Sequence, residues 1–129
     1  MNLLLDTHLL LWSACASDRL SSQARETIGD PANSLWFSAV SLWEVAIKRG
    51  LDRPDFRVEP GVLRSGLLAN GYQEQALSGR HCLALMQLPP IHRDPFDRML
   101  IAQAQSEGFI LLTADAKVAR YPGGAVRQV

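Results

Sequence analysis

Four acidic residues, Asp6, Glu44, Asp97 and Asp115, lie within or beside apolar segments of the sequence. Asp6 directly follows three leucines, Glu44 is the only charged residue in 39–47, and Asp97 and Asp115 flank a third apolar block. A carboxylate among apolar neighbours is destabilising unless a partner compensates its charge. If the fold brings the four together, the natural partner is a hard divalent cation with oxygen ligands, and the sequence indicates a metal-dependent enzyme.

Short apolar runs alternate with helical segments and predict the elements that would position these acids. Strands are expected at residues 2–5, 34–38, 72–77 (weakly), 110–113 and 125–128. Helices are expected from about residue 8, and at 21–28, 39–49, 61–70, 79–86 and 95–107. Buried strands that alternate with helices favour an α/β fold, with a parallel sheet covered on both faces.

This architecture offers the four acids a common location. Asp6 follows the first strand and Asp115 follows the strand at 110–113. In open α/β sheets the functional crevice lies beyond the carboxyl ends of the strands. Glu44 and Asp97 lie in helices that follow connecting segments, so both can reach the same edge. The sequence allows this convergence but does not require it.

Asp6 and Glu44 also have structural interpretations. Asp6 can cap the helix that follows it, although Thr7 can do so instead and leave Asp6 facing the crevice. Glu44 can form a capping box with Ser41 or an i,i+4 pair with Lys48. Its position on an apolar stripe nevertheless favours a functional role, because an ionised carboxylate there needs a partner.

The second pair of acids is more open to interpretation. Asp94 precedes Pro95 and is the natural N-cap of its helix, so we expect a structural role for it. Asp97, in the first helical turn, could simply complement the helix dipole. Asp115 could be a turn residue, and its structural and functional readings carry similar weight. Capping, surface or packing roles are expected for the histidines at positions 8, 81 and 92, and core positions for the tryptophans at 12, 36 and 43.

Basic residues lie near two of the acidic segments. Arg93 and Arg98 flank Asp97 and are the first candidates for contacts with a phosphate group. A second group follows the Glu44 helix, diluted by two aspartates, and by default it is a solvated face. Its members are Lys48, Arg49, Arg53 and Arg57.

Composition and charge narrow the class of protein. The 129 residues, 47% of them hydrophobic, fit one domain spanning 1–129. Thirteen basic residues balance thirteen acidic ones, so four acids in one site would leave four excess positive charges on the remaining surface. The two cysteines lie in apolar, helix-like stretches, and we expect them to be buried. We also expect a cytoplasmic protein without a membrane partner, because neither a signal peptide nor a long apolar segment is recognised. No phosphate-binding Gly-rich loop is recognised either.

Four stretches, in order and with their spacing, resemble the PIN domain family and more narrowly VapC-type toxin ribonucleases of type II toxin–antitoxin pairs. The resemblance extends from residue 2 to the end of the chain. The stretches are Leu4-Leu5-Asp6-Thr7-His8 with Leu10-Leu11-Trp12, Ser38-Ala39-Val40-Ser41-Leu42-Trp43-Glu44, Asp94-Pro95-Phe96-Asp97-Arg98-Met99-Leu100-Ile101-Ala102, and Leu111-Leu112-Thr113-Ala114-Asp115.

The resemblance implies a three-layer α/β/α sandwich with a central parallel sheet. It also implies an endoribonuclease that uses Mg²⁺ or Mn²⁺ to activate water, leaving a 5′-phosphate and a 3′-hydroxyl. The implied partners are an RNA substrate, an antitoxin protein and a second copy of the chain in a homodimer. The implied metal ligands and catalytic residues are Asp6, Glu44, Asp97 and Asp115, with the hydroxyl groups of Thr7 and Thr113 beside them.

Three other readings stay open. A PIN nuclease could process RNA as a housekeeping enzyme and not as a toxin. A domain of this kind could also bind RNA without cleaving it. A phosphatase with Asp6 as nucleophile is disfavoured, because that chemistry normally uses a second acid two residues later, where this chain has His8.

Overall fold

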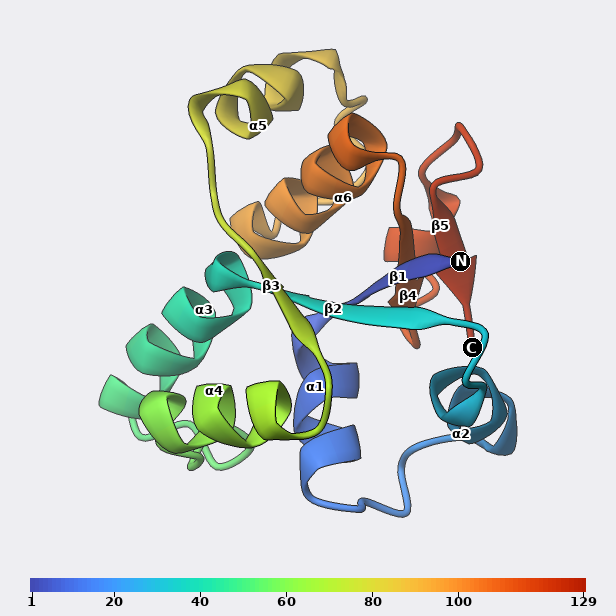
Figure 1. Cartoon of the computed structure of the whole chain (residues 1–129). Helices are drawn as coiled ribbons and strands as arrows, with labels where there is room; N and C mark the ends of the chain where they lie inside the picture. The colour runs from blue at the N-terminus through green and yellow to red at the C-terminus, as the bar shows by residue number, and fades with distance from the viewer.

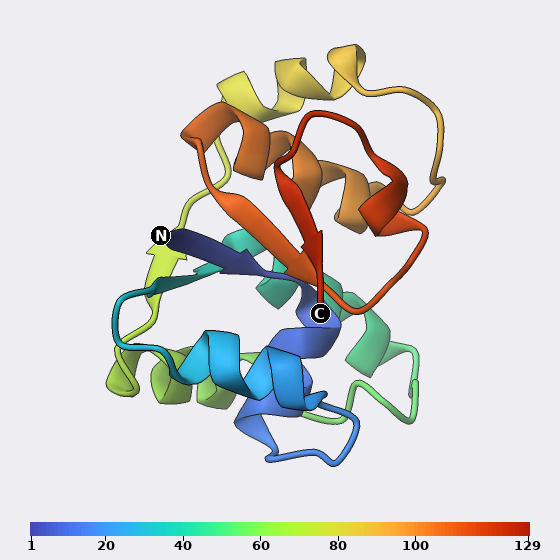
Figure 2. The ribbon, with the colours of Figure 1, turned by 90° about the vertical axis from the view of Figure 1, so that its right-hand side faces the viewer.

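The computed structural model describes all 129 residues and is built on a five-stranded, wholly parallel sheet. Its spatial order is β3-β2-β1-β4-β5, with the first strand in the centre (Figure 1). The strands are β1 (Asn2–Leu5), β2 (Ser34–Ser38), β3 (Gln73–Gln75), β4 (Ile110–Thr113) and β5 (Val126–Gln128). Figure 2 shows the C-terminal segment returning to run beside β4.

Helices cover both faces of the sheet, which confirms the expected α/β/α sandwich. One face carries α5 (Gly79–Ala84) and α6 (Pro95–Glu107), drawn above the sheet in Figure 1. The other face carries α1 (Thr7–Ala14), α2 (Ser22–Gly29) and α4 (Pro60–Ala69). Beyond the end of β2, α3 (Ala39–Gly50) contacts α1, α4 and α6 and so joins the two layers. Two short 3₁₀ helices, η1 (Leu85–Gln87) and η2 (Val118–Arg120), complete the chain.

The sheet separates two hydrophobic cores, because successive side chains of a strand point to opposite faces. Leu3 and Leu5 contribute to the core beneath α1 and α4, while Leu4 between them contributes to the core beneath α6. The same alternation divides Leu112 from Leu111. All five of these leucines are fully buried, which explains why the strands read as unbroken apolar runs.

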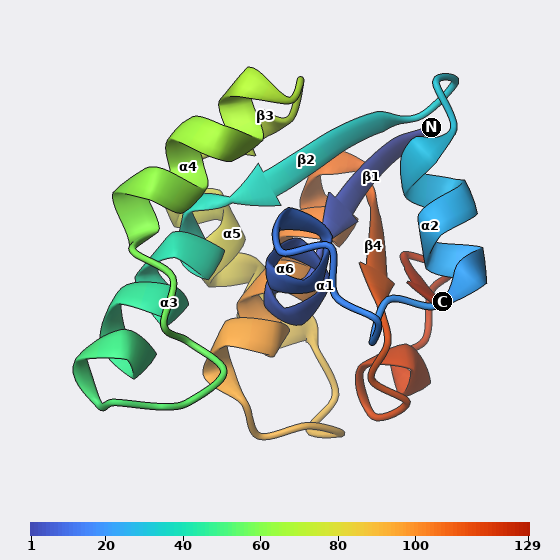
Figure 3. The ribbon, with the colours of Figure 1, turned by 90° about the horizontal axis from the view of Figure 1, so that it is seen from below.

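The register places the ends of β1 and β4 side by side. Leu5 is opposite Leu112, and the backbone amide of Asp6 donates to the Leu112 carbonyl at 3.0 Å. The chain therefore leaves both strands at the same edge of the sheet, the lower edge in Figure 3. The loops that carry Asp6 and Asp115 begin as neighbours at that edge.

Most of the predicted elements are present, with differences at several positions. The weak strand at 72–77 is only Gln73–Gln75, and η2 was not anticipated. Cys15, the C-cap of α1, and Cys82, within α5, are exposed, so the expectation of buried cysteines was wrong. Trp43 is 56% exposed and was wrongly expected in the core. None of the helices combines the length and apolar character needed to span a bilayer.

Candidate active site

Asp6 is held by both of its carboxylate oxygens at the junction of β1 and α1. Its Oδ1 accepts the backbone N–H of Leu9 at 2.9 Å, so Asp6 is the N-cap of α1. Its Oδ2 accepts the hydroxyl of Thr113, the last residue of β4, at 2.6 Å. Of the two capping residues that the sequence offers, Asp6 and not Thr7 is therefore the cap. Capping and site function coincide in Asp6, because each oxygen keeps a second lone pair for another partner.

Glu44 is fixed in a similar way from α3. Its Oε1 accepts the hydroxyl of Thr7 at 2.6 Å, and its Oε2 is paired with the ammonium of Lys48 at 2.5 Å. The i,i+4 pair with Lys48 is therefore present, but the capping box with Ser41 is not, because Ser38 caps α3. Glu44 is only 2% exposed, so this carboxylate cannot turn to solvent for compensation.

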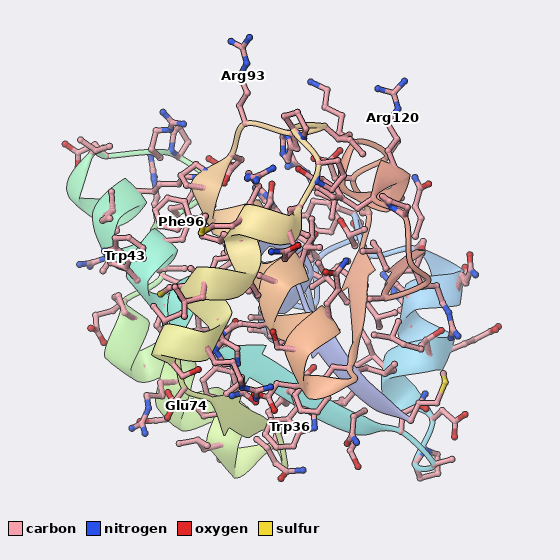
Figure 4. The ribbon with its side chains drawn as sticks, turned by 90° about the horizontal axis from the view of Figure 1, so that it is seen from above. Trp36, Trp43, Glu74, Arg93, Phe96 and Arg120 are labelled. Carbon is pink, nitrogen blue, oxygen red and sulfur yellow. The ribbon has the colours of Figure 1, made fainter.

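Lys48 is itself held in place by aromatic rings. Its Nζ lies 4.8 Å from the centroid of the Phe56 ring and 5.6 Å from that of Phe96. The ring faces attract the ammonium, and they restrict a side chain that would otherwise be mobile. Phe96 in turn packs edge-on against Trp43, as Figure 4 shows. The ammonium group that pairs with Glu44 is therefore held in a fixed position by the surrounding aromatic side chains.

Asp97 enters the site from the first turn of α6. Its Oδ2 lies 2.9 Å from His92 Nε2, a contact that the sequence reading missed because it assigned no site role to the histidine. The loop carrying His92 is held by the buried Tyr121, whose hydroxyl accepts the His92 backbone N–H at 2.9 Å. Asp94 caps α6 as predicted, through the amides of Phe96 and Asp97.

The electrostatic environment unites three of the four acids. Burial raises the pKa of Asp6 above its usual value, against the lowering effect of the Thr113 hydroxyl, and the charge of Glu44 raises it further. Burial also raises the pKa of Asp97 to about 6, and the charges of Asp94, Asp6 and Glu44 contribute to the rise. Desolvation and the repulsion of neighbouring carboxylates thus act together on Asp6 and Asp97.

Asp115 lies at the exposed rim of this group. Its Oδ1 accepts the backbone N–H of Lys117, as expected of a turn residue, while its own N–H donates to the Thr113 hydroxyl at 3.0 Å. Thr113 therefore links Asp115 to Asp6, although the Asp115 carboxylate is not drawn into the buried cluster. The structure brings three acids together and leaves the fourth beside them.

The two arginines expected to contact phosphate differ in their placement. Arg98 donates to the carbonyl oxygen of Pro89 and to the Tyr121 hydroxyl, both at 3.0 Å, so its guanidinium secures the loop before α6. This placement argues against the expected role in phosphate binding. Arg93, on the same loop, forms no ion pair and extends away from the protein in Figure 4.

A family model described as the PIN domain matches residues 3–124 of this chain. The protein belongs to the PIN domain family. The fold is also shared with VapBC2 from Rickettsia felis, whose structure was solved with a DNA fragment from the VapBC2 promoter. The TM-score is 0.70 and the identity is 15%, with coverage of 99% of this chain and 98% of that one. For VapBC-1 from nontypeable Haemophilus influenzae the TM-score is 0.62 and the identity is 18%, with coverage of 93% of this chain and 91% of that one. No sequence among the curated proteins matches the chain.

The donor set of this PIN domain fits a hard divalent cation. Three carboxylates face one another with Lys48 as their one lysine partner, and each hydrogen-bonded oxygen retains a free lone pair. The tightest group of candidate ligand atoms is His92, Asp94 and Asp97, all within 4.8 Å of one another. The trio of Asp6, Glu44 and Asp97 is more open, which suits an ion such as Mg²⁺ that keeps several waters.

Proposed function

We propose that this PIN domain is a metal-dependent endoribonuclease and the toxin of a type II toxin–antitoxin pair. The observation that carries the proposal is the convergence of Asp6, Glu44 and Asp97 at the carboxyl edge of the sheet. Asp6 and Glu44 are at most 5% exposed, and the one ammonium paired with the trio, that of Lys48, meets Glu44, so the trio keeps an excess of negative charge. A purely structural cluster would not retain such a charge, because it destabilises the folded state.

Asp6, Glu44 and Asp97 would hold Mg²⁺ or Mn²⁺, with Asp115 acting at the rim, directly or through water. The chemistry supplied by the bound cation would be neutralisation of a phosphate charge and acidification of a water molecule. The part of the protein itself is to fix its ligands in advance. Leu9 and Thr113 hold the two oxygens of Asp6, while Thr7 and Lys48 hold those of Glu44.

His92 and the threonines would act by positioning. His92 Nε2 orients the Asp97 carboxylate, and in the neutral ring a donating Nε2–H leaves Nδ1 as an acceptor. Thr7 and Thr113 are inaccessible to solvent and already engaged with acids, at 2% and 0% exposure. We therefore propose that these two residues align carboxylates, and that direct substrate contact is left to exposed groups such as Arg93.

The toxin role is supported by the likeness to two VapBC structures, which reaches across nearly the whole chain. We infer that an antitoxin partner binds this protein. Induction of the chain alone in a bacterial host should arrest growth, and co-expression of the small gene adjacent to it should restore growth. Growth that continues on induction of soluble protein would favour a housekeeping PIN nuclease.

The direct test of the nuclease is cleavage of a mixed panel of tRNA and rRNA fragments with Mn²⁺, Mg²⁺ or EDTA. Asp97→Asn should lower the cleavage rate by about a thousandfold or more, since it removes a charged ligand while keeping the shape of the side chain. Asp6→Asn should do the same, and Asp18→Asn, at an exposed position outside the cluster, should cleave like the wild type. Full activity of Asp6→Asn or Asp97→Asn would contradict the assignment.

A non-catalytic RNA-binding domain predicts a different pattern. In that case the wild type would bind the same fragments without metal and cut none of them, and Asp97→Asn would bind equally well or more tightly. Metal-dependent cuts that disappear in EDTA and in Asp97→Asn would exclude that reading. The positions of the cuts would then begin to define the target.

A further inference from the structure

The segment that connects α3 to α4 forms a second charged feature of the molecule. Together with the last turn of α3 it lines an open pocket of about 590 Å³, formed by Arg49, Asp52, Arg53, Phe56 and Arg57. Three arginines against one aspartate make this a basic pocket, whereas the protein as a whole carries no net charge. The sequence alone predicts an ordinary solvated face for these basic residues, because nothing in their spacing indicates a pocket.

The three guanidinium groups are free to bind an anion. None of the ion pairs in the protein involves Arg49, Arg53 or Arg57. Arg49 uses only its Nε within the fold, donating to the Arg57 carbonyl at 3.3 Å, and this bond closes the loop while leaving its terminal nitrogens available. The lining carries three positive charges against the one negative charge of Asp52, so an anion in the pocket would relieve the repulsion between the arginines.

The loop that presents these arginines is ordered by its own backbone. The amide of Asp52 donates to the Arg49 carbonyl at 3.0 Å, and that of Phe56 donates to the Arg53 carbonyl at 3.0 Å. Asp52 has a φ of 56°, a left-handed conformation that turns the chain sharply after α3. Successive turns of this kind hold the basic side chains around one space.

The basic pocket and the acidic site share a wall. Phe56, which is only 2% exposed, lines the pocket, and its ring lies 4.8 Å from the Lys48 ammonium. Lys48 is bound in turn to Glu44. In Figure 3 the connection after α3 lies on the same side of the molecule as the loop that leads into α6 and Asp97. A polyanion crossing the acidic site in that direction would reach the arginines next.

We propose that the pocket of Arg49, Arg53, Phe56 and Arg57 binds a backbone phosphate of the RNA strand, outside the bond that is cut. The inference rests on the nuclease function proposed above. Arginine suits this ligand because its planar fork donates two parallel hydrogen bonds to phosphate oxygens. Contacts on this side of Glu44 also offset the repulsion between the acidic site and the other phosphates of the strand.

RNA fits the pocket better than an acidic peptide does. Through Phe56 the pocket shares a wall with a site whose acids would hold a cation for a phosphodiester, so one strand would satisfy both features. An acidic segment of a protein partner would gain at the arginines but would be repelled by Asp6, Glu44 and Asp97. A contact to backbone phosphate also carries no sequence preference, so it would fix the register and direction of the strand.

The test is the binding of a fluorescein-labelled 20-nucleotide single-stranded RNA by fluorescence anisotropy in EDTA, over a series of salt concentrations. Each phosphate contact that is removed should reduce the slope of log K against log salt by about 0.7. Arg53→Gln should therefore lower the slope by about that amount and weaken binding roughly tenfold at low salt. Arg19→Gln makes the same change of charge in the α1–α2 connection, away from the pocket, and should leave the slope unchanged.

Three outcomes would overturn the inference: an unchanged slope in both Arg53→Gln and Arg57→Gln, an equal reduction in Arg19→Gln, or an arginine-dependent preference for a poly-glutamate peptide over the RNA. The thermal unfolding of each variant shows whether it is folded, and Arg53→Lys, which keeps the charge, should retain the slope. The binding measurement involves no cleavage. An arginine-dependent slope in a protein that cuts no RNA would therefore refute the nuclease and leave the pocket standing as an RNA-binding site.

Discussion

Two clusters of buried polar side chains occupy opposite ends of α6, and they differ in how their charges are balanced. One is the acidic site around Asp97, at the start of the helix. The other joins Ser38, Gln103, His81 and Glu107 further along it. Ser38 donates to Gln103 at 2.5 Å, and His81 Nε2 lies 2.8 Å from Glu107. This second cluster is a closed hydrogen-bonded network whose one acid also meets Arg80 at 2.6 Å.

The comparison shows how a structural polar cluster differs from a functional one. In the Gln103 network each donor has an acceptor, and the hydrogen bond from His81, together with the charge of Arg80, lowers the pKa of its carboxylate, Glu107. In the acidic site, burial and repulsion raise the pKa values of Asp6 and Asp97. Burial alone therefore does not mark a site. A functional site is identified by buried charge that the fold leaves uncompensated, because a bound ligand must then neutralise that charge.

The largest effect that would separate the clusters is stabilisation by metal. At free Mn²⁺ a hundredfold above its dissociation constant, the wild type should gain about 2.7 kcal/mol in the free energy of unfolding. For a domain of this size the melting temperature should rise by roughly 10 °C, measurable by calorimetry. Asp97→Asn should lose most of this gain, and Asp18→Asn should keep it. An unchanged melting temperature in excess Mn²⁺ would count against a shared metal site.

The Gln103 network should respond in the opposite sense. Gln103→Met keeps the volume of the side chain but removes the acceptor of the Ser38 hydroxyl, which is fully buried. Leaving this donor without a partner should lower the free energy of unfolding by about 1–3 kcal/mol, measured with urea. The gain from Mn²⁺ should persist in the variant, because the network holds no ion. Loss of the Mn²⁺ response without loss of stability would contradict the division between the clusters.

The pH dependence of the stability of the metal-free protein distinguishes the two clusters in a third way. The raised pKa of Asp97, about 6, means that the folded state binds a proton that the unfolded state releases between about pH 4 and pH 6. The contribution of Asp97 to stability is therefore fully present below pH 4 and falls as the pH rises to 6, and the raised pKa of Asp6 acts in the same direction.

The measurement is urea unfolding in EDTA at several pH values. Asp97→Asn should be the more stable protein above pH 6, by roughly 1–3 kcal/mol, and the difference should shrink towards pH 4. The carboxylates with lowered pKa values, such as Glu74 and Glu107, begin to lose their contribution as the pH falls through 4.5, and this loss is common to both proteins. A wild type that gained stability relative to the variant between pH 4 and pH 6 would show that Asp97 is compensated in the folded state.

The sequence indicates the sheet and the start of α6 well, because both depend on local pattern. Unbroken leucine runs mark strands buried on two faces, and Asp94-Pro95 marks the start of α6. The strand order, the role of His92 and the basic pocket depend on contacts between distant segments. His92 meets Asp97 from a loop that is held by Tyr121, 29 residues further along the chain than His92. No spacing within the sequence carries that information.

The smallest expected effect concerns Asp115, whose turn geometry was an open alternative from the sequence. Its carboxylate is exposed and accepts the Lys117 amide, so water can compensate its charge. Asp115→Asn should therefore lower the cleavage rate only about tenfold, far less than Asp97→Asn, if the residue acts through a water on the cation. Thr113→Val is the informative companion, because it removes the hydroxyl that joins Asp115 to Asp6.

If the rim acts by holding Asp6 in place, Thr113→Val should reduce both cleavage and the Mn²⁺-induced rise in melting temperature more than Asp115→Asn does. Metal titrations followed by calorimetry would measure the second quantity without RNA. A loss in Asp115→Asn as deep as that in Asp97→Asn would place Asp115 among the metal ligands. It would also show that an exposed carboxylate can complete a buried cluster, and the contrast between compensated and uncompensated charge would then have to extend to the rim of the site.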